Sequence, residues 1–88
     1  MVVRKVNCKN FSGKHLFFMF LKDKPKTSVW EVRNKYEYTL LGCVKWFAKF
    51  RKYSFFPEKD TVFEKDCLRD IADFCEERTG EQRSKKLL

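Results

Sequence analysis

The chain has 88 residues, of which 43% are hydrophobic and 36% charged, and its formal net charge is +8. Its ten Phe, three Tyr and two Trp exclude a disordered polar chain and suffice for the small core of one domain, because each buried ring removes about 150–250 Å² from water. The most apolar run, residues 16–21, is far too short to span a bilayer.

The charge is unevenly placed along the chain. Residues 1–57 carry 13 lysine and arginine residues against three acids, whereas residues 58–77 carry three against eight. A basic body favours polyanionic partners and steers their approach, although the charge of a small aromatic-rich domain also keeps it soluble.

The N-terminal part predicts β structure. Apolar residues within 2–11 indicate a strand, and Ser12-Gly13 is a turn signal. The ring-rich residues 14–22 favour a second strand, and a short helix capped by Ser12 is the alternative. Residues 22–28 predict a polar loop.

The central part alternates in the way that half-exposed strands do. Three strands are predicted, at residues 29–34, 38–47 and 53–56. Gly42 inside the second of them indicates a bulge or a close backbone approach. An amphipathic helix over residues 44–53, with Trp46, Phe50 and Tyr53 on one face, is the alternative for the predicted hairpin.

A helix is predicted over residues 65–77, because apolar residues recur there at helical spacing. A capping box of Thr61 and Glu64 marks its start, unless the helix begins one turn later. Gly80 is expected to stop the helix, which leaves 81–88 as a charged, frayed tail after a single domain of residues 1–80. The side chains expected to pack on the sheet are Leu68, Ile71, Ala72 and Cys75.

The predicted fold class is therefore α+β: an antiparallel sheet of three or more strands with one C-terminal helix packed on one face. The opposite face of the sheet is left for solvent or for a partner.

Residues 30–75, about half of the chain, carry several specific strings. These are W-E-V-R-N-K, L-G-C-V-K-W-F, R-K-Y-S-F-F-P, T-V-F and C-L-R-D-I-A-D-F. In this pattern the chain resembles a family of small uncharacterised proteins encoded by bacteriophages and prophages. The resemblance implies a phage or mobile-element origin, and it transfers no activity, cofactor or catalytic residue.

No motif for catalysis, phosphate cradling or a cofactor occurs, and the four cysteines and His15 do not have zinc-site spacing. Cys8 and His15 are only two ligands, which makes a shared metal a weak hypothesis, and His15 is expected to pack beside its Phe-rich neighbours. The sequence therefore predicts no enzyme, metal or cofactor. No signal peptide is recognised, so we expect reduced thiols and a cytoplasmic location, in the host cell if the protein is phage-encoded.

Cations alternate with rings in residues 44–57, which predicts a two-sided hairpin. Val44 and Trp46 are expected in the core, and Phe47 is expected as the exposed ring. The residues predicted to form the contact surface are Arg33, Lys35, Lys45, Phe47, Lys49, Arg51, Lys52 and Tyr53.

Such a surface is typical of a nucleic-acid-binding module, in which cations neutralise phosphates and rings stack on bases of DNA or RNA. The alternative is a phage accessory protein that binds and inhibits a host protein such as a defence nuclease complex, because Trp and Arg are also common anchors of protein interfaces. Membrane attachment ranks last, since the predicted helix is acidic on its outer face. The sequence does not predict the oligomeric state.

Overall fold

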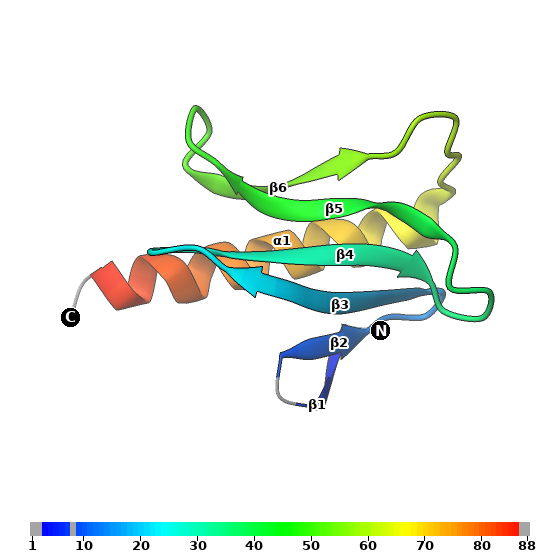
Figure 1. Cartoon of the computed structure of the whole chain (residues 1–88), viewed down its shortest axis with the longest axis horizontal. Helices are drawn as coiled ribbons and strands as arrows, with labels where there is room; N and C mark the ends of the chain where they lie inside the picture. The colour runs from blue at the N-terminus through cyan, green and yellow to red at the C-terminus, as the bar shows by residue number, and fades with distance from the viewer. Residues whose placement is uncertain (1–2, 8, 87–88) are drawn as a thin grey trace.

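Six antiparallel strands form one sheet and a single helix packs against one of its faces (Figure 1). The computed structural model describes residues 3–7 and 9–86. The elements are β1 (Arg4–Asn7), β2 (Asn10–Ser12), β3 (Leu16–Asp23), β4 (Ser28–Asn34), β5 (Leu40–Phe47), β6 (Lys52–Pro57) and α1 (Lys65–Lys86). Strand order in the sheet follows chain order. The predicted α+β class is confirmed.

Strand pairing explains which side chains face the helix. Phe18 lies opposite Val32 and Phe20 lies opposite Trp30 in the β3–β4 ladder, and paired residues point to the same face of an antiparallel sheet. Intervening residues such as Met19 point to the other face, which we call the outer face. Residues 14–22 thus contribute a strand, as predicted. The helix considered for 44–53 is excluded, because β5 and β6 pair there.

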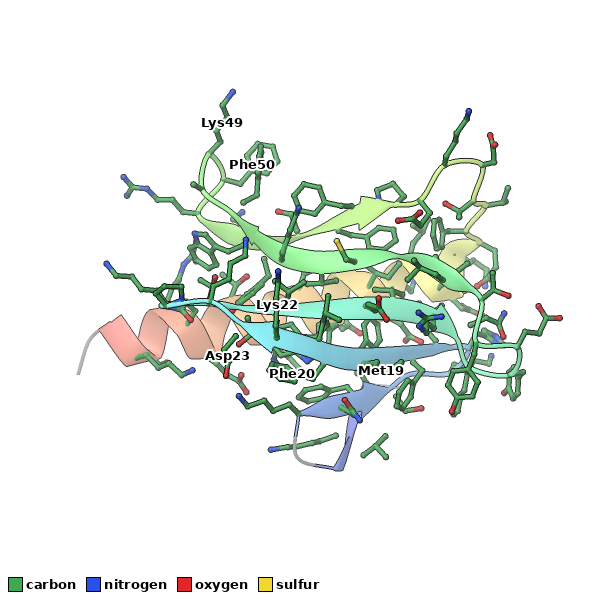
Figure 2. All side chains as sticks on the ribbon, in the orientation of Figure 1. Met19, Phe20, Lys22, Asp23, Lys49 and Phe50 are labelled. Carbon is green, nitrogen blue, oxygen red and sulfur yellow. The ribbon has the colours of Figure 1, made fainter. Side chains whose placement is uncertain are left out.

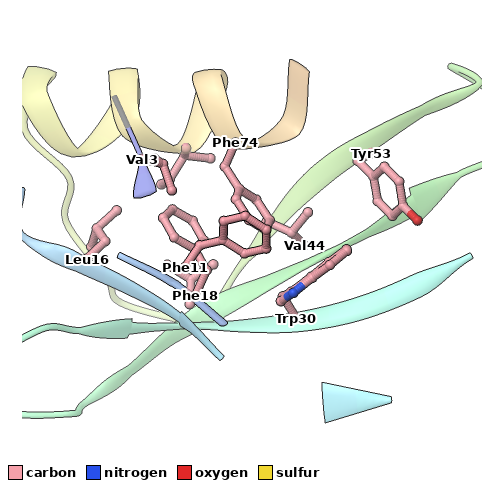
Figure 3. Packing of buried hydrophobic residues seen from close by; sticks show 10 residues of the cluster. Val3, Phe11, Leu16, Phe18, Trp30, Val44, Tyr53 and Phe74 are labelled. Carbon is pink, nitrogen blue, oxygen red and sulfur yellow. The ribbon is translucent and has the colours of Figure 1, made fainter. Parts of the chain in front are cut away.

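The core between sheet and helix is built from rings (Figure 3). Phe74 of α1 stacks on Phe18, with ring centroids 4.2 Å apart. Phe11 and Trp30 meet the same ring edge-on, at 5.2 Å and 5.1 Å. Val44 is fully buried as predicted, and Trp46 is half-buried against the cluster. A few large rings therefore exclude water from a very small core.

Only glycine fits at position 42, because two groups of β6 occupy the space that a side chain would need. A Cβ there would lie 2.5 Å from the backbone oxygen of Phe56 and 2.7 Å from Cε1 of Phe55. The β4–β5 register also shifts beside it, between Val32 and Arg33. The expected close approach and irregular pairing are both confirmed.

The helix begins one turn later than the capping box places it. Glu64 precedes its first residue, and the Glu64 carboxylate accepts a hydrogen bond from the Cys67 amide at 2.7 Å. Thr61 donates instead to the backbone oxygen of Glu58. The alternative start considered from the sequence is therefore the observed one.

The helix packs through a face that differs from the predicted one. Ile71 is buried and Cys75 is half-buried, as expected, but Leu68 is 51% exposed and Ala72 is also exposed. The fully buried residue is Phe74. The apolar stripe is wide enough for two orientations of the helix on the sheet. The helix takes the one that buries the Phe74 ring.

The predicted stop at Gly80 is wrong, because α1 continues through residues 81–86. Arg78, Thr79 and Gln82 are buried against the sheet, and the Thr79 hydroxyl accepts a hydrogen bond from the Tyr53 amide at 3.0 Å. These contacts hold the helix on both sides of the glycine, because tertiary packing outweighs its low helix propensity.

Candidate nucleic-acid interface

The topology gathers three basic segments at one end of the sheet. The β3–β4 loop and the β5–β6 hairpin lie at the same end, and the C-terminal half of α1 passes beneath them (Figure 1). Arg83 of the helix donates a hydrogen bond to the backbone oxygen of Arg51 in the hairpin, at 3.2 Å. We call this region the basic end. Its exposed cations are Lys22, Lys24, Lys26, Lys49, Arg51, Lys52, Arg83 and Lys85.

The tip of the β5–β6 hairpin exposes a ring between two cations. Phe50 is 65% exposed and projects from the tip beside Lys49 (Figure 2), and Arg51 follows it in the sequence. The Phe50 ring meets the Phe47 ring edge-on, with centroids 4.9 Å apart, and this contact fixes the orientation of Phe50. Arg51 takes a left-handed conformation, with φ of 55°, and its amide bonds the Phe47 oxygen at 2.9 Å. The tight turn therefore holds the ring outward.

The outer face next to the hairpin continues this mixture of charge and rings. The Lys45 ammonium lies 4.6 Å from the centre of the Phe56 ring. Phe56 in turn packs on Phe47, which is half-buried. The exposed ring of the hairpin is thus Phe50, and the expectation that it is Phe47 is corrected.

The predicted contact surface is divided between the two ends of the sheet. Lys45, Phe47, Lys49, Arg51 and Lys52 gather at or near the basic end. Arg33 and Lys35 lie at the opposite end because β4 runs away from the loop.

Both residues at the far end are engaged with the protein itself. Arg33 pairs with Glu31 at 3.0 Å and donates to the backbone oxygen of Tyr38 at 2.8 Å. The Lys35 ammonium donates to the oxygen of Gly13 at 3.1 Å. Their charges are therefore less available to a partner than those of the hairpin.

Tyr53 was predicted on the contact surface, and the structure corrects this. Its side chain is 5% exposed, its hydroxyl accepts a hydrogen bond from the Ser28 amide at 3.0 Å, and burial raises its pKa. Tyr53 lies opposite Trp46 in the β5–β6 ladder. Both rings therefore point toward the helix side, and Tyr53 links the hairpin to the core.

Sequence reasoning missed the lysines at the end of β3 and in the β3–β4 loop, and the cations of the last helical turns. The signal was present as Lys22, Lys24 and Lys26 at every second position, but a polar loop explains such a pattern equally well. Only the fold brings them beside the hairpin.

One group of side chains near the start of α1 has metal-ligand chemistry among the described residues. Possible ligand atoms of His15, Glu64 and Asp66 lie within 4.8 Å of one another. The Asp66 carboxylate already meets Lys14, Lys65 and Arg69, and that of Glu64 caps the helix. Cys8, considered with His15, lies outside the described residues. This group does not form a convincing metal centre.

The helix thiols are poorly suited to nucleophilic chemistry. Burial raises the pKa of Cys75 to about 11, and burial together with the Glu64 side chain raises that of Cys67 to about 11. Both are protonated at neutral pH, and the thiolate is the reactive form.

Comparisons with protein-family models, with curated proteins and with solved structures find no match for this chain. Within the described residues, no helix has the length and apolar character needed to cross a membrane.

Proposed function

We propose that the protein is a binding module, not an enzyme, and that its basic end binds single-stranded DNA or RNA with little sequence preference. The observation that carries this proposal is Phe50, an exposed ring flanked by Lys49 and Arg51. The proposal includes the phage or mobile-element origin implied by the resemblance over residues 30–75, with action in the host cytoplasm.

The chemistry of the basic end suits a flexible polyanion. Its exposed lysines and arginines can neutralise successive phosphates, and the release of counterions then favours binding. A base stacked on Phe50 would add about 1–3 kcal/mol. Stacking of this kind requires unpaired bases, which is why we propose a single strand over a duplex. Stacking on a ring and contacts with phosphates tolerate any base, so sequence preference should be weak.

The opposite end of the sheet is a weaker candidate. Its cations Arg33 and Lys35 are engaged by the protein, and acids such as Glu37 and Glu58 lie beside the turns there. This difference between the two ends supplies a matched control.

The test compares two triple variants by fluorescence anisotropy, with a labelled oligonucleotide of about 12 residues. Wild type should bind at low salt, with log affinity falling linearly as log salt rises. Changing Lys49, Arg51 and Lys52 to Ala should weaken binding and flatten the slope by about 2, the value for three phosphate contacts on a single strand. Changing Lys14, Lys35 and Lys59 to Ala should leave the slope nearly unchanged.

Two results would contradict the proposal. One is the absence of any complex at high micromolar protein and low salt. The other is an equal loss in both triple variants, which would indicate a response to net charge alone.

The second candidate is an accessory protein that binds a host protein complex. It is favoured by the outer face, which no element covers within the described residues (Figure 2). Phe17, Met19 and Phe56 lie half-buried on that face. A host partner captured in a pull-down, with binding that resists salt and survives the hairpin variant, would support this candidate over nucleic acid.

A further inference from the structure

A recess of about 450 Å³ opens at the basic end on the helix side of the sheet. It lies between the β1–β2 strands, the β3–β4 loop and the last turns of α1, and its size is in the range of small-ligand sites. The cations that line it are Lys5, Lys9, Lys24, Lys26, Arg78 and Lys85. The acids that line it are Asp23 and Glu81.

Arg78 is the unusual member of this lining. It is 5% exposed, and its guanidinium lies 4.1 Å from the centre of the Phe11 ring and 5.0 Å from that of Phe74. Its Nε and Nη1 atoms are buried and have no hydrogen-bond acceptor among the described residues. Buried donors without an acceptor are rare and costly in folded proteins, and such donors suit a site in which a bound anion supplies the acceptor.

Glu81 is the nearer of the two acids that pair with this guanidinium, since a Glu77 oxygen lies 3.5 Å from Nη2. One Glu81 oxygen lies 3.2 Å from Nη2 and the other lies 3.2 Å from Nε, the latter without hydrogen-bond alignment. The Glu81 side chain is 62% exposed, so it can swing toward solvent. A better-shaped anion could then take its place beside Arg78.

The other acid of the recess is already compensated. Asp23 accepts hydrogen bonds from Lys9 at 2.8 Å and from the Ser28 hydroxyl at 2.6 Å, and these bonds lower its pKa. Lys24 and Lys26 make no ion pair with any described residue. The recess therefore retains an excess of positive charge after its internal pairs are formed.

We propose that this recess binds a phosphomonoester, displacing Glu81 from Arg78. A phosphomonoester carries about −1.5 to −2 charges at pH 7 and three acceptor oxygens, whereas a phosphodiester inside a strand carries one charge. Arginine matches phosphate oxygens with paired donors. The same group occurs in a free mononucleotide and at the phosphorylated end of a nucleic-acid strand, and only the strand-end source rests on the function proposed above.

The first experiment titrates the full chain with inorganic phosphate, with a nucleoside 5′-monophosphate and with the same nucleoside lacking phosphate, by calorimetry. Inorganic phosphate and the monophosphate should bind, and the nucleoside should not. The double substitution Lys24→Gln with Lys85→Gln should weaken monophosphate binding roughly tenfold or more. The matched double substitution Lys49→Gln with Arg51→Gln, on the hairpin, should leave it unchanged.

Glu81→Gln gives a prediction of opposite sign. Removing the competing carboxylate should tighten monophosphate binding severalfold, while a purely structural ion pair predicts no gain. Arg78→Gln could simply fail to fold, so the exposed lysine variants and Glu81→Gln are the ones that decide.

The second experiment separates the two sources of the phosphate. Oligonucleotides of one sequence are compared with a 5′-phosphate, with a 3′-phosphate and with neither. A terminal phosphate that tightens binding to wild type but not to the Lys24/Lys85 variant supports the strand end as the source. Monophosphate binding without this effect supports a free nucleotide.

Failure of this proposal can be told from failure of the proposed function. The absence of monophosphate and phosphate binding at millimolar concentration overturns the recess, even if oligonucleotides bind the hairpin. An equal loss of monophosphate affinity in the Lys49/Arg51 and Lys24/Lys85 variants also overturns the recess, since such a result would show a response to overall charge. Absence of oligonucleotide binding overturns only the proposed function.

Discussion

Phe74 is fully buried and lies at the centre of the ring cluster, parallel to Phe18 within 10°. Truncating it to Ala removes the stacked contact and leaves a cavity, so we expect the free energy of unfolding to fall by about 3–5 kcal/mol. Urea denaturation measures this. Leu68→Ala is the matched control on the same helix and should change stability by less than about 0.5 kcal/mol, because Leu68 is exposed. A reversed order would mean that the helix packs through the face predicted from its sequence.

Asp70 is a buried acid of α1 whose side chain holds the β2–β3 turn against the helix. Its carboxylate accepts a hydrogen bond from the Lys14 amide at 2.8 Å, and a Cβ on Gly13 would overlap it. Asp70→Ala should cost about 1–3 kcal/mol, because it orphans that amide. Glu76→Ala, at an exposed position of the same helix, should be nearly neutral in the same denaturation assay. Equal stability of both variants would show that the contact contributes nothing.

At the scale of the element, the stability of α1 can be tested at Gly80. This residue lies inside the helix, and a Cβ there would meet nothing within 4 Å apart from the neighbouring backbone of the helix itself. Gly80→Ala should therefore raise the free energy of unfolding by about 0.4–1 kcal/mol, mainly by restricting the unfolded chain. Gly42→Ala is the opposite control and should destabilise, because β6 fills its space. Destabilisation by Gly80→Ala would indicate the helix stop expected from the sequence.

The strands could be predicted from the sequence, and the helix end could not. Residues 29–34 alternate because one face of β4 packs on the helix and the other does not, and that burial pattern is visible in the residue types. The end of α1 depends on Thr79 and Gln82 packing on strands distant in sequence. Local propensity at Gly80 does not contain that information.

The candidate interface was predictable only where its residues are neighbours in the chain. Lys49, Arg51 and Lys52 occur together in the hairpin, so their clustering follows from sequence. The sequence predicts Tyr53 on the surface, and this is wrong because its side of the strand depends on pairing with Trp46. The loop cations and Arg83 join the site through strand order and helix docking, which no local pattern describes.

At the scale of the whole molecule, the uneven charge has a cost in stability. The net charge is +8, and exposed cations crowd the end where the helix is tied to the hairpin by the Arg83–Arg51 and Thr79–Tyr53 hydrogen bonds. Mutual repulsion acts against those ties. The repulsion that weakens the fold and the attraction for phosphates therefore share one origin, and both depend on ionic strength.

Salt should consequently have opposite effects on folding and on binding. Raising NaCl from about 0.02 M to about 0.3 M shortens the Debye length from roughly 20 Å to below 10 Å. Screening of the basic end should raise the Tm, measured by circular dichroism, while it weakens oligonucleotide binding. In the variant with Lys49, Arg51 and Lys52 changed to Ala, the Tm should start higher at low salt and respond less to NaCl. A Tm that falls with salt would mean that ion pairs such as Lys9–Asp23 and Arg33–Glu31 outweigh the repulsion. An unchanged salt response in the variant would locate the repulsion away from the hairpin.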